Sequence, residues 1–103
     1  MRNAGMLILD RNWRPHDSEV VGEVDLIARD GDALVIVEVT TRQSLAFGTP
    51  VQAVTRRKIR QLRSLALAWL DARSIHAPSL RFDVISVTIP PAGQPVVEHL
   101  RAV

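Results

Sequence analysis

The amino-acid sequence predicts an α/β or α+β domain in which a mixed β-sheet packs against one long helix. Two alternating apolar runs flank Asp30-Gly31-Asp32, and such a pattern is typical of a β-hairpin. Apolar residues recur at helical spacing over residues 59–70. Further strand-like runs lie before the hairpin and after the helix. The predicted order is therefore βββαββ, arranged as a sandwich of sheet and helix.

The composition is that of one folded domain spanning residues 1–103. Apolar residues make up 47% of the chain, which is enough for a core and too much for a disordered protein. No run approaches the length of a membrane span, and residues 1–6 lack the apolar core of a signal peptide. The absence of Cys excludes disulfides and thiolate chemistry, and it fits a reducing, cytoplasmic environment.

The basic residues are almost all arginine. Lys58 is the single lysine among the 13 Lys and Arg residues, and the formal net charge is +2 with a pI of about 10.4. Arginine forms forked hydrogen bonds with phosphate groups, which favours a nucleic-acid partner. A modest net charge does not demonstrate such a partner, so the positions of the arginines carry the argument.

The elements are predicted in chain order as follows. A first strand is expected over residues 6–12, with Trp13 packing at its end and a polar loop after it. In the hairpin, Val24, Leu26 and Ala28 are expected to share one face. A loop over residues 42–48 leads to the helix, which has a capping box at 49–52 and a second capping residue at Thr55.

The helix and the last two strands complete the prediction. The helix is expected to end near Ser74, before Pro78. A strand over residues 80–89 is stopped by Pro90-Pro91, and a short strand over 96–100 lies at a sheet edge. The residues expected to form the buried stripe of the helix are Ile59, Leu62, Ala66, Trp69 and Leu70.

Two acidic residues lie on the otherwise apolar hairpin strands. A two-residue turn at Gly31-Asp32 sets Asp25 directly opposite Glu38, whereas a turn at Asp30-Gly31 makes them diagonal neighbours. In both registers the two side chains share a face, with Cβ atoms within about 8 Å of each other. Carboxylates this close repel each other unless a divalent cation lies between them. The alternative is a solvated polar face on an edge hairpin.

The hairpin acids resemble the D…(D/E)-x-K core of the PD-(D/E)XK nuclease superfamily. Over residues 7–87 the chain is similar to the YraN-type family, a bacterial group of predicted endonucleases with a restriction-endonuclease-like fold. Two departures stand out: Thr40 replaces the motif Lys, and the acid-bearing helix that usually precedes the first strand is missing from this sequence. The matching segments are RNWR (11–14), GEVDLIARDG (22–31), VIVEV (35–39) and AVTRRK (53–58).

This resemblance implies an endonuclease that hydrolyses phosphodiester bonds of DNA with Mg²⁺ or Mn²⁺. Carried over by position, Asp25 and Glu38 are metal ligands, the backbone carbonyl of Val39 is a third, and Glu23 is an accessory candidate. The metal polarises the phosphate and lowers the pKa of the attacking water. Asp83, on the later strand, either faces this site or pairs with a helix or loop.

Thr40 occupies the position at which the superfamily places its lysine. Its hydroxyl can hydrogen-bond a water molecule, but it carries no charge to offset the developing anion. Lys58, in the helical motif, and Arg42, two residues beyond Thr40, are the candidates to replace that charge. The alternative is a degenerate site in a module of the same fold that only binds nucleic acid or assembles with other proteins.

A row of arginines follows the start of the helix. Arg56, Arg60 and Arg63 recur at i, i+4 and i+7, and Arg57 extends the row. No acid lies between residues 39 and 70, so these cations lack i,i+4 partners. We expect them, with Arg42, to bind nucleic-acid phosphates without reading bases; the alternative is an ordinary solvated face. A homodimer through a sheet edge is compatible with the pattern but is not indicated by it.

Overall fold

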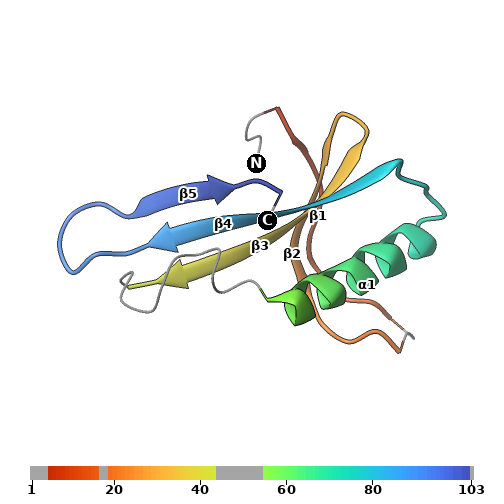
Figure 1. Ribbon diagram of the computed structural model, residues 1–103, viewed down its shortest axis with the longest axis horizontal. Helices are drawn as coiled ribbons and strands as arrows, with labels where there is room; N and C mark the ends of the chain where they lie inside the picture. Colours follow the sequence, from red (N-terminus) through yellow and green to blue (C-terminus); the bar gives the residue numbers. More distant parts are fainter. Residues whose placement is uncertain (1–4, 17–18, 44–54, 103) are drawn as a thin grey trace.

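The computed structural model describes residues 5–16, 19–43 and 55–102, and its elements follow the predicted order (Figure 1). They are β1 (Leu7–Trp13), β2 (Val24–Asp30), β3 (Ala33–Arg42), α1 (Arg56–Ala72), β4 (Ser79–Thr88) and β5 (Val96–Leu100). The strands form one five-stranded sheet in the order β1-β2-β3-β4-β5. Pairing of β3 with β4 is parallel, and the other pairs are antiparallel. The predicted α+β class and the mixed sheet are confirmed.

The β2–β3 hairpin turns at Gly31-Asp32. Its pairs run from Asp30 opposite Ala33 to Leu26 opposite Val37, which is the first of the two predicted registers. Gly31 has a φ of +60°, a conformation that glycine adopts without the steric penalty of a Cβ atom. Carried one pair beyond Leu26, this register sets residue 25 level with residue 38.

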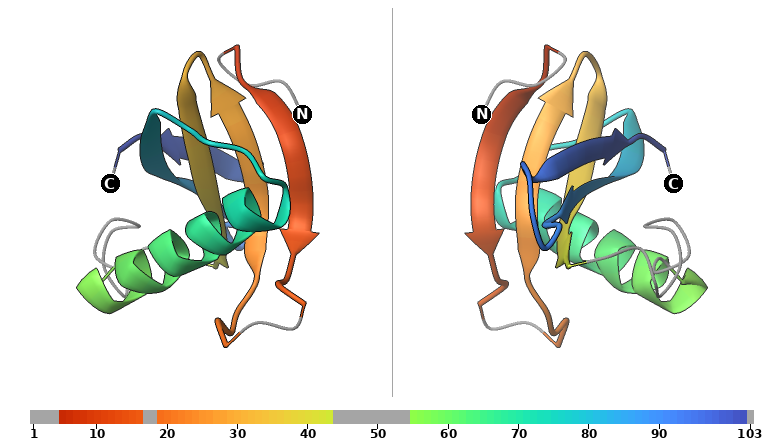
Figure 2. Two further views of the ribbon diagram at one scale, coloured as in Figure 1. Left: turned by 90° about the vertical axis from the view of Figure 1, so that its right-hand side faces the viewer. Right: turned by 90° about the vertical axis from the view of Figure 1, so that its left-hand side faces the viewer.

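Apolar side chains cover both faces of the sheet. Helix α1 crosses one face (Figure 2), where its buried residues pack against Ile27, Leu34 and Ile36. The second core cluster lies on the opposite face and contains Met6, Ala28, Val35, Val37 and Ile85. The helix residues that the first cluster buries are Leu62, Leu65, Ala66, Trp69 and Leu70.

The predicted alternation of the hairpin is wrong at Val24. This residue packs in the α1-side cluster with Ile27, whereas Leu26 and Ala28 pack on the other face. On the neighbouring strand, Asn12 has a φ of +47° between the Arg11–Leu26 and Trp13–Val24 pairs. The regular two-residue period of the sheet is therefore interrupted next to Asp25, which is where the candidate site lies.

Helix α1 begins after Thr55, as one of the two predicted capping signals requires. The Thr55 side chain accepts a hydrogen bond from the Lys58 backbone N–H at 3.1 Å. The other signal, the capping box at 49–52, lies outside the described residues. The helix ends at Ala72, two residues before the expected position. Its buried stripe includes Leu65, and Ile59 is only partly buried.

A polar clamp joins the last turns of α1 to β1. The Asp10 carboxylate accepts hydrogen bonds from Trp69 Nε1 at 3.0 Å and from Arg73 at 2.8 Å. The hydrogen bond from Trp69 is the largest cause that lowers the pKa of Asp10, and Arg73 adds to it. This clamp fixes the direction of α1 across the sheet and so positions its first turn over β3.

Among the described residues, no helix has the length and apolar character to cross a membrane.

Candidate metal and phosphate site

The single lysine of the chain points at Glu38. Lys58 lies one turn before Leu62, at the start of the buried stripe of α1, so its side chain leaves the helix toward the sheet. Glu38 follows Ile36 on the same face of β3. Lys58 Nζ lies 3.3 Å from Glu38 Oε2, and both side chains are partly buried. The expectation that Lys58 faces the hairpin is confirmed.

Asp25 binds the backbone of the strand that carries Glu38. Its Oδ2 accepts a hydrogen bond from the Val39 N–H at 2.8 Å. The paired register of β2 and β3 ends at Leu26 and Val37, so this side-chain bond lies just beyond the ladder. The N–H and C=O of one strand residue point to the same neighbouring strand, so the Val39 carbonyl also faces the side of β2. The Asp25 carboxylate therefore lies against the segment of β3 that carries Glu38.

Thr40 lies two residues after Glu38 on β3, so its side chain is on the same α1-facing side of the strand. Its Oγ1 is buried and has no hydrogen-bond partner among the residues that the structure describes. A buried hydroxyl without a partner costs roughly 1–3 kcal/mol, and such groups are uncommon in folded proteins.

The donors at this site are all hard oxygen atoms. They comprise two carboxylates, the Val39 carbonyl and the Thr40 hydroxyl. Within the described parts of the chain, no group of three or more His, Cys, Asp or Glu side chains is placed to hold a metal. Mg²⁺ is commonly held by one or two protein carboxylates, with water and substrate phosphates completing its shell. The donor set therefore fits Mg²⁺ or Mn²⁺ bound together with a phosphate.

The other two candidates at the site have different surroundings. Arg14 contacts Oε2 of Glu23, with Nε at 2.8 Å and a terminal nitrogen at 2.7 Å, so the accessory candidate is already in an ion pair. Arg42 is the last residue of β3, which shows that the strand runs as far as its predicted role requires. The other candidate cation, Lys58, contacts Glu38 as described above.

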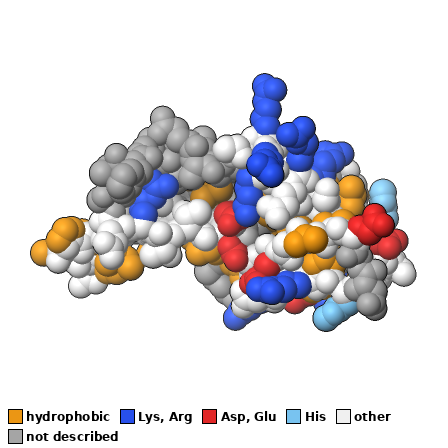
Figure 3. Space-filling view, turned by 90° about the horizontal axis from the view of Figure 1, so that it is seen from below, with side chains coloured by type: hydrophobic (Ala, Val, Ile, Leu, Met, Phe, Trp, Pro, Cys, Tyr) orange, Lys and Arg blue, Asp and Glu red, His pale blue; other side chains and the backbone are white. Residues whose placement is uncertain are grey.

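The arginine row is exposed along the first half of α1. Arg56, Arg57, Arg60 and Arg63 are all exposed, and none forms an ion pair with the residues described. The first turn contains no acid, so its cations oppose the helix dipole, at about 0.3–1 kcal/mol each. Figure 3 shows Lys and Arg side chains gathered on one part of the surface, next to acidic ones. Helix stability therefore does not explain this row.

Gln61 is a residue near the site that the sequence analysis missed. Its Nε2 donates to the Val21 carbonyl at 3.3 Å and so joins α1 to the segment before β2. A Cβ atom at Gly22, which has a φ of +135°, would lie 2.7 Å from the same nitrogen. Gly22 was the available signal, because a glycine before a strand marks a close approach. This contact anchors the chain just before Asp25.

Asp83 lies on the face of the sheet opposite α1 and does not join the site. It is opposite Val37 in the β3–β4 pairing, and Val37 packs in the cluster on that face. Its partners include Arg81 on β4 and His99 on β5. The structure thus separates Asp83 from Asp25 and Glu38.

Comparison with known proteins identifies similar sequences. The model of "Uncharacterised protein family UPF0102" matches residues 1–87. A UPF0102 protein of Rhodococcus opacus is 50% identical over 101 residues, covering 98% of this chain and 82% of the relative. One from Beutenbergia cavernae is 52% identical over 99 residues, covering 96% and 80%. One from Nocardia farcinica is 48% identical over 103 residues, covering 100% and 78%. These similarities establish the family and specify no reaction.

Proposed function

This chain belongs to the uncharacterised protein family UPF0102, and we propose that it is a metal-dependent endonuclease that hydrolyses phosphodiester bonds of DNA. The proposal includes a restriction-endonuclease-like core of the PD-(D/E)XK type and a cytoplasmic location. The observation that carries it is the 3.3 Å contact between Lys58 and Glu38. That contact supplies, from the helix, the cation that Thr40 does not supply from the strand.

Each residue has a defined part in the proposed reaction. Bound to Asp25, Glu38 and the Val39 carbonyl, Mg²⁺ or Mn²⁺ would polarise the scissile phosphate and lower the pKa of the attacking water. Lys58 Nζ orients that water and stabilises the negative charge that develops on the phosphate. The Thr40 hydroxyl, which is buried beside Glu38, holds the same water by a hydrogen bond.

The arginine row gives the site its substrate class. Phosphate contacts fix the position of a nucleic acid on a protein and supply most of the sequence-independent affinity. Arg56, Arg57, Arg60 and Arg63 start in the same helical turn as Lys58 and continue along the exposed face of α1. A strand bound along this row therefore lies next to the carboxylate pair.

A cleavage assay tests the proposal. Wild-type protein is expected to nick supercoiled plasmid slowly when Mg²⁺ or Mn²⁺ is present and not in EDTA. Glu38→Gln should abolish nicking because it removes one carboxylate ligand while keeping the side-chain shape. Glu98→Gln, an exposed acid on β5, is the matched control and should cleave like wild type. Wild-type protein that never nicks, or nicking that survives Glu38→Gln, would favour the non-catalytic module.

The arginine row predicts a steep salt dependence of DNA binding. In EDTA, the logarithm of affinity should fall with the logarithm of salt concentration by about 0.9 for each phosphate contact. Neutralising Arg56, Arg60 and Arg63 to Gln should reduce that slope by up to about 0.9 per residue, as measured by fluorescence anisotropy. Arg29→Gln, an exposed arginine on β2, is the control. An unchanged slope in the triple variant would show that the arginine row is an ordinary solvated surface that does not bind phosphates.

A further inference from the structure

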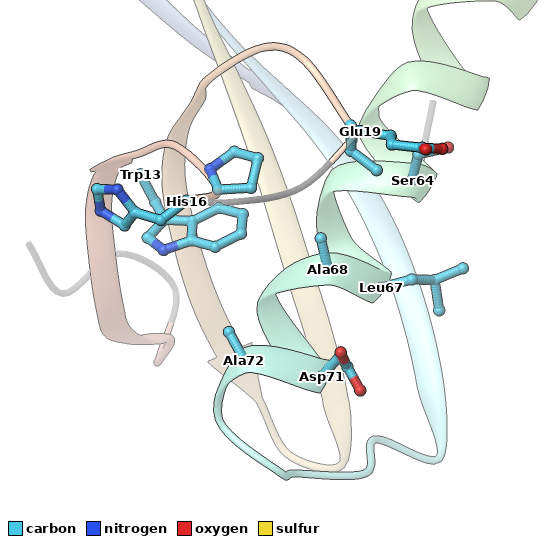
Figure 4. A pocket seen from close by; sticks show the side chains of 10 residues that line it. Trp13, His16, Glu19, Ser64, Leu67, Ala68, Asp71 and Ala72 are labelled. Carbon is cyan, nitrogen blue, oxygen red and sulfur yellow. The ribbon is translucent and has the colours of Figure 1, made fainter.

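A cavity of about 760 Å³ lies beside the arginine row, between α1 and the segment that follows β1 (Figure 4). One wall is formed by Trp13, Pro15 and His16, and the other by the side of α1 from Ser64 to Ala72. The proposed function does not use this cavity. Its volume is within the range of protein sites that bind small organic groups.

The walls of the cavity suit a flat aromatic group. The Trp13 indole is only partly buried, and the helix wall opposite it carries the small residues Ala68 and Ala72. Part of Trp13 packs against the α1-side core cluster, and a ring that enters the cavity can meet the remaining, accessible part of the indole next to these small residues. Indole rings provide the largest stacking surface of any side chain, and nucleobases stack on such rings irrespective of their sequence.

The acidic groups of the cavity are hydrogen-bond acceptors, whereas His16 and Ser64 can donate or accept. Glu19 lies with Ser64 at one end and Asp71 at the other end in Figure 4. Carboxylates accept hydrogen bonds and repel phosphate, so the cavity itself disfavours the backbone of a nucleic acid. The same carboxylates accept hydrogen bonds from the amino groups of guanine, cytosine or adenine, and thymine has no such amino group.

The cavity opens next to the cations that would hold phosphates. Arg60 lies one turn before Ser64, and Arg63 lies one turn before Leu67, which is 51% exposed at the lip of the cavity. Charge is thus divided along α1, with the arginines in its first half and Asp71 near its end. A nucleotide whose phosphate rests on the row has its base within reach of the cavity.

We propose that this cavity binds one unpaired nucleobase of the DNA strand whose phosphates lie on Arg60 and Arg63. The base stacks on Trp13, and its amino group donates a hydrogen bond to Glu19 or Asp71. A paired base cannot enter, because it remains stacked in the duplex until it is extruded. This inference rests on the proposed function for the nucleic-acid strand, but it does not require the strand to be cut.

The test compares two DNA duplexes in EDTA that differ only by one unpaired guanine. Wild-type protein should bind the duplex with the unpaired base about tenfold more tightly, since stacking of one base commonly contributes this much. Its tryptophan fluorescence should be quenched on binding. Trp69 is only 2% exposed, so quenching reports on Trp13. Trp13→Phe should remove the quenching and keep most of the preference, because Phe still provides a ring.

Two further variants separate the cavity from the general charge of the protein. Ala68→Leu fills the cavity from the helix and should abolish the preference for the unpaired base, with folding checked by thermal melting. Wild-type protein should also prefer an unpaired guanine over an unpaired thymine, and Glu19→Ala combined with Asp71→Ala should remove this preference because it removes both acceptors. The matched control combines Asp32→Ala with Glu98→Ala, which removes two exposed acids outside this cavity.

Two results would overturn the inference. One is equal affinity of wild-type protein for the two duplexes. The other is a preference for the unpaired base that persists in folded Ala68→Leu protein. In both cases plasmid nicking that depends on Glu38 would still support the proposed function, because that assay does not involve the cavity. Conversely, loss of nicking in Glu38→Gln should leave the unpaired-base preference unchanged.

Discussion

Lys58→Met is expected to lower the rate of metal-dependent DNA cleavage by about 10²–10³-fold, the usual effect of removing one electrostatic catalytic group. Methionine keeps an unbranched stem at the start of the buried stripe but removes the charge that lies 3.3 Å from Glu38. The rate of plasmid nicking at saturating protein measures the effect. Arg57→Met removes a cation from the same helical turn and is the matched control, which should weaken binding but leave the saturated rate near wild type.

A second substitution tests whether the charge can come from the strand instead. Thr40→Lys in the Lys58→Met background places an ammonium group on the face of β3 that carries Glu38. It should recover much of the lost rate, and adding Glu38→Ala should abolish the recovery. Lys58→Met protein that cleaves as fast as wild type would contradict the role of the helix lysine.

The largest effect on stability is expected at Asp83. Its side chain is fully buried and accepts two hydrogen bonds from Arg81 at 3.0 Å and one from the Ala102 N–H at 3.0 Å. His99 Nε2 lies 2.7 Å from its Oδ2. Arg81 also contacts Asp30 at 2.8 Å. This network joins β4 to β5 and to the turn end of β2.

Asp83→Ala should therefore reduce the free energy of unfolding by about 3–5 kcal/mol, because Arg81 keeps only its ion pair with Asp30 while the Ala102 N–H and His99 lose their buried acceptor. Urea denaturation measures it. Ser86→Ala is the matched control on the same strand: Ser86 is equally buried, and its Oγ has no partner among the described residues, so its removal breaks no hydrogen bond there and should not lower stability. Equal effects of the two substitutions would show that the network contributes nothing beyond packing.

The same network predicts loss of stability in acid. Burial raises the pKa of Asp83, but the hydrogen bonds from Arg81, Ala102 and His99 outweigh it, so the pKa is below its ordinary value of 3.8. A depressed folded-state pKa gives a contribution to stability that is present above the unfolded pKa and lost as pH falls through the folded one. Unfolding free energy should thus fall below about pH 4, and Asp83→Asn should flatten this fall. If the unfolding free energy of Asp83→Asn protein falls by the same amount in acid, the loss of stability arises from Asp10 and other carboxylates instead.

Much of the fold could be predicted because local patterns determine it. Turn residues set the hairpin register at Gly31-Asp32, and a threonine at the right position capped α1 at Thr55. The helical period also places Lys58 on the same side of α1 as the buried Leu62. The direction of the Lys58 side chain toward the sheet could therefore be predicted from the sequence. The two-residue period placed Ile36, Glu38 and Thr40 on one face in the same way.

The features that were missed depend on contacts between distant segments. Val24 changes face where the paired strand has an irregular backbone at Asn12, and no pattern in the hairpin reveals this. The Asp83 network needs His99 from the edge strand and Arg81 from its own strand. The bond from Asp25 to the Val39 N–H depends on where the ladder ends. Pairing and packing in three dimensions decide each of these.

The central claim is that Asp25 and Glu38 together bind a divalent cation. Titration of Mn²⁺ into the full chain, followed by isothermal calorimetry, tests it most directly. We expect weak binding at one site in wild-type protein, loss of binding in Asp25→Asn and in Glu38→Gln, and unchanged binding in the exposed-acid control Asp32→Asn. Binding that persists in both site variants, or no binding by either wild-type or Thr40→Lys protein, would contradict the claim.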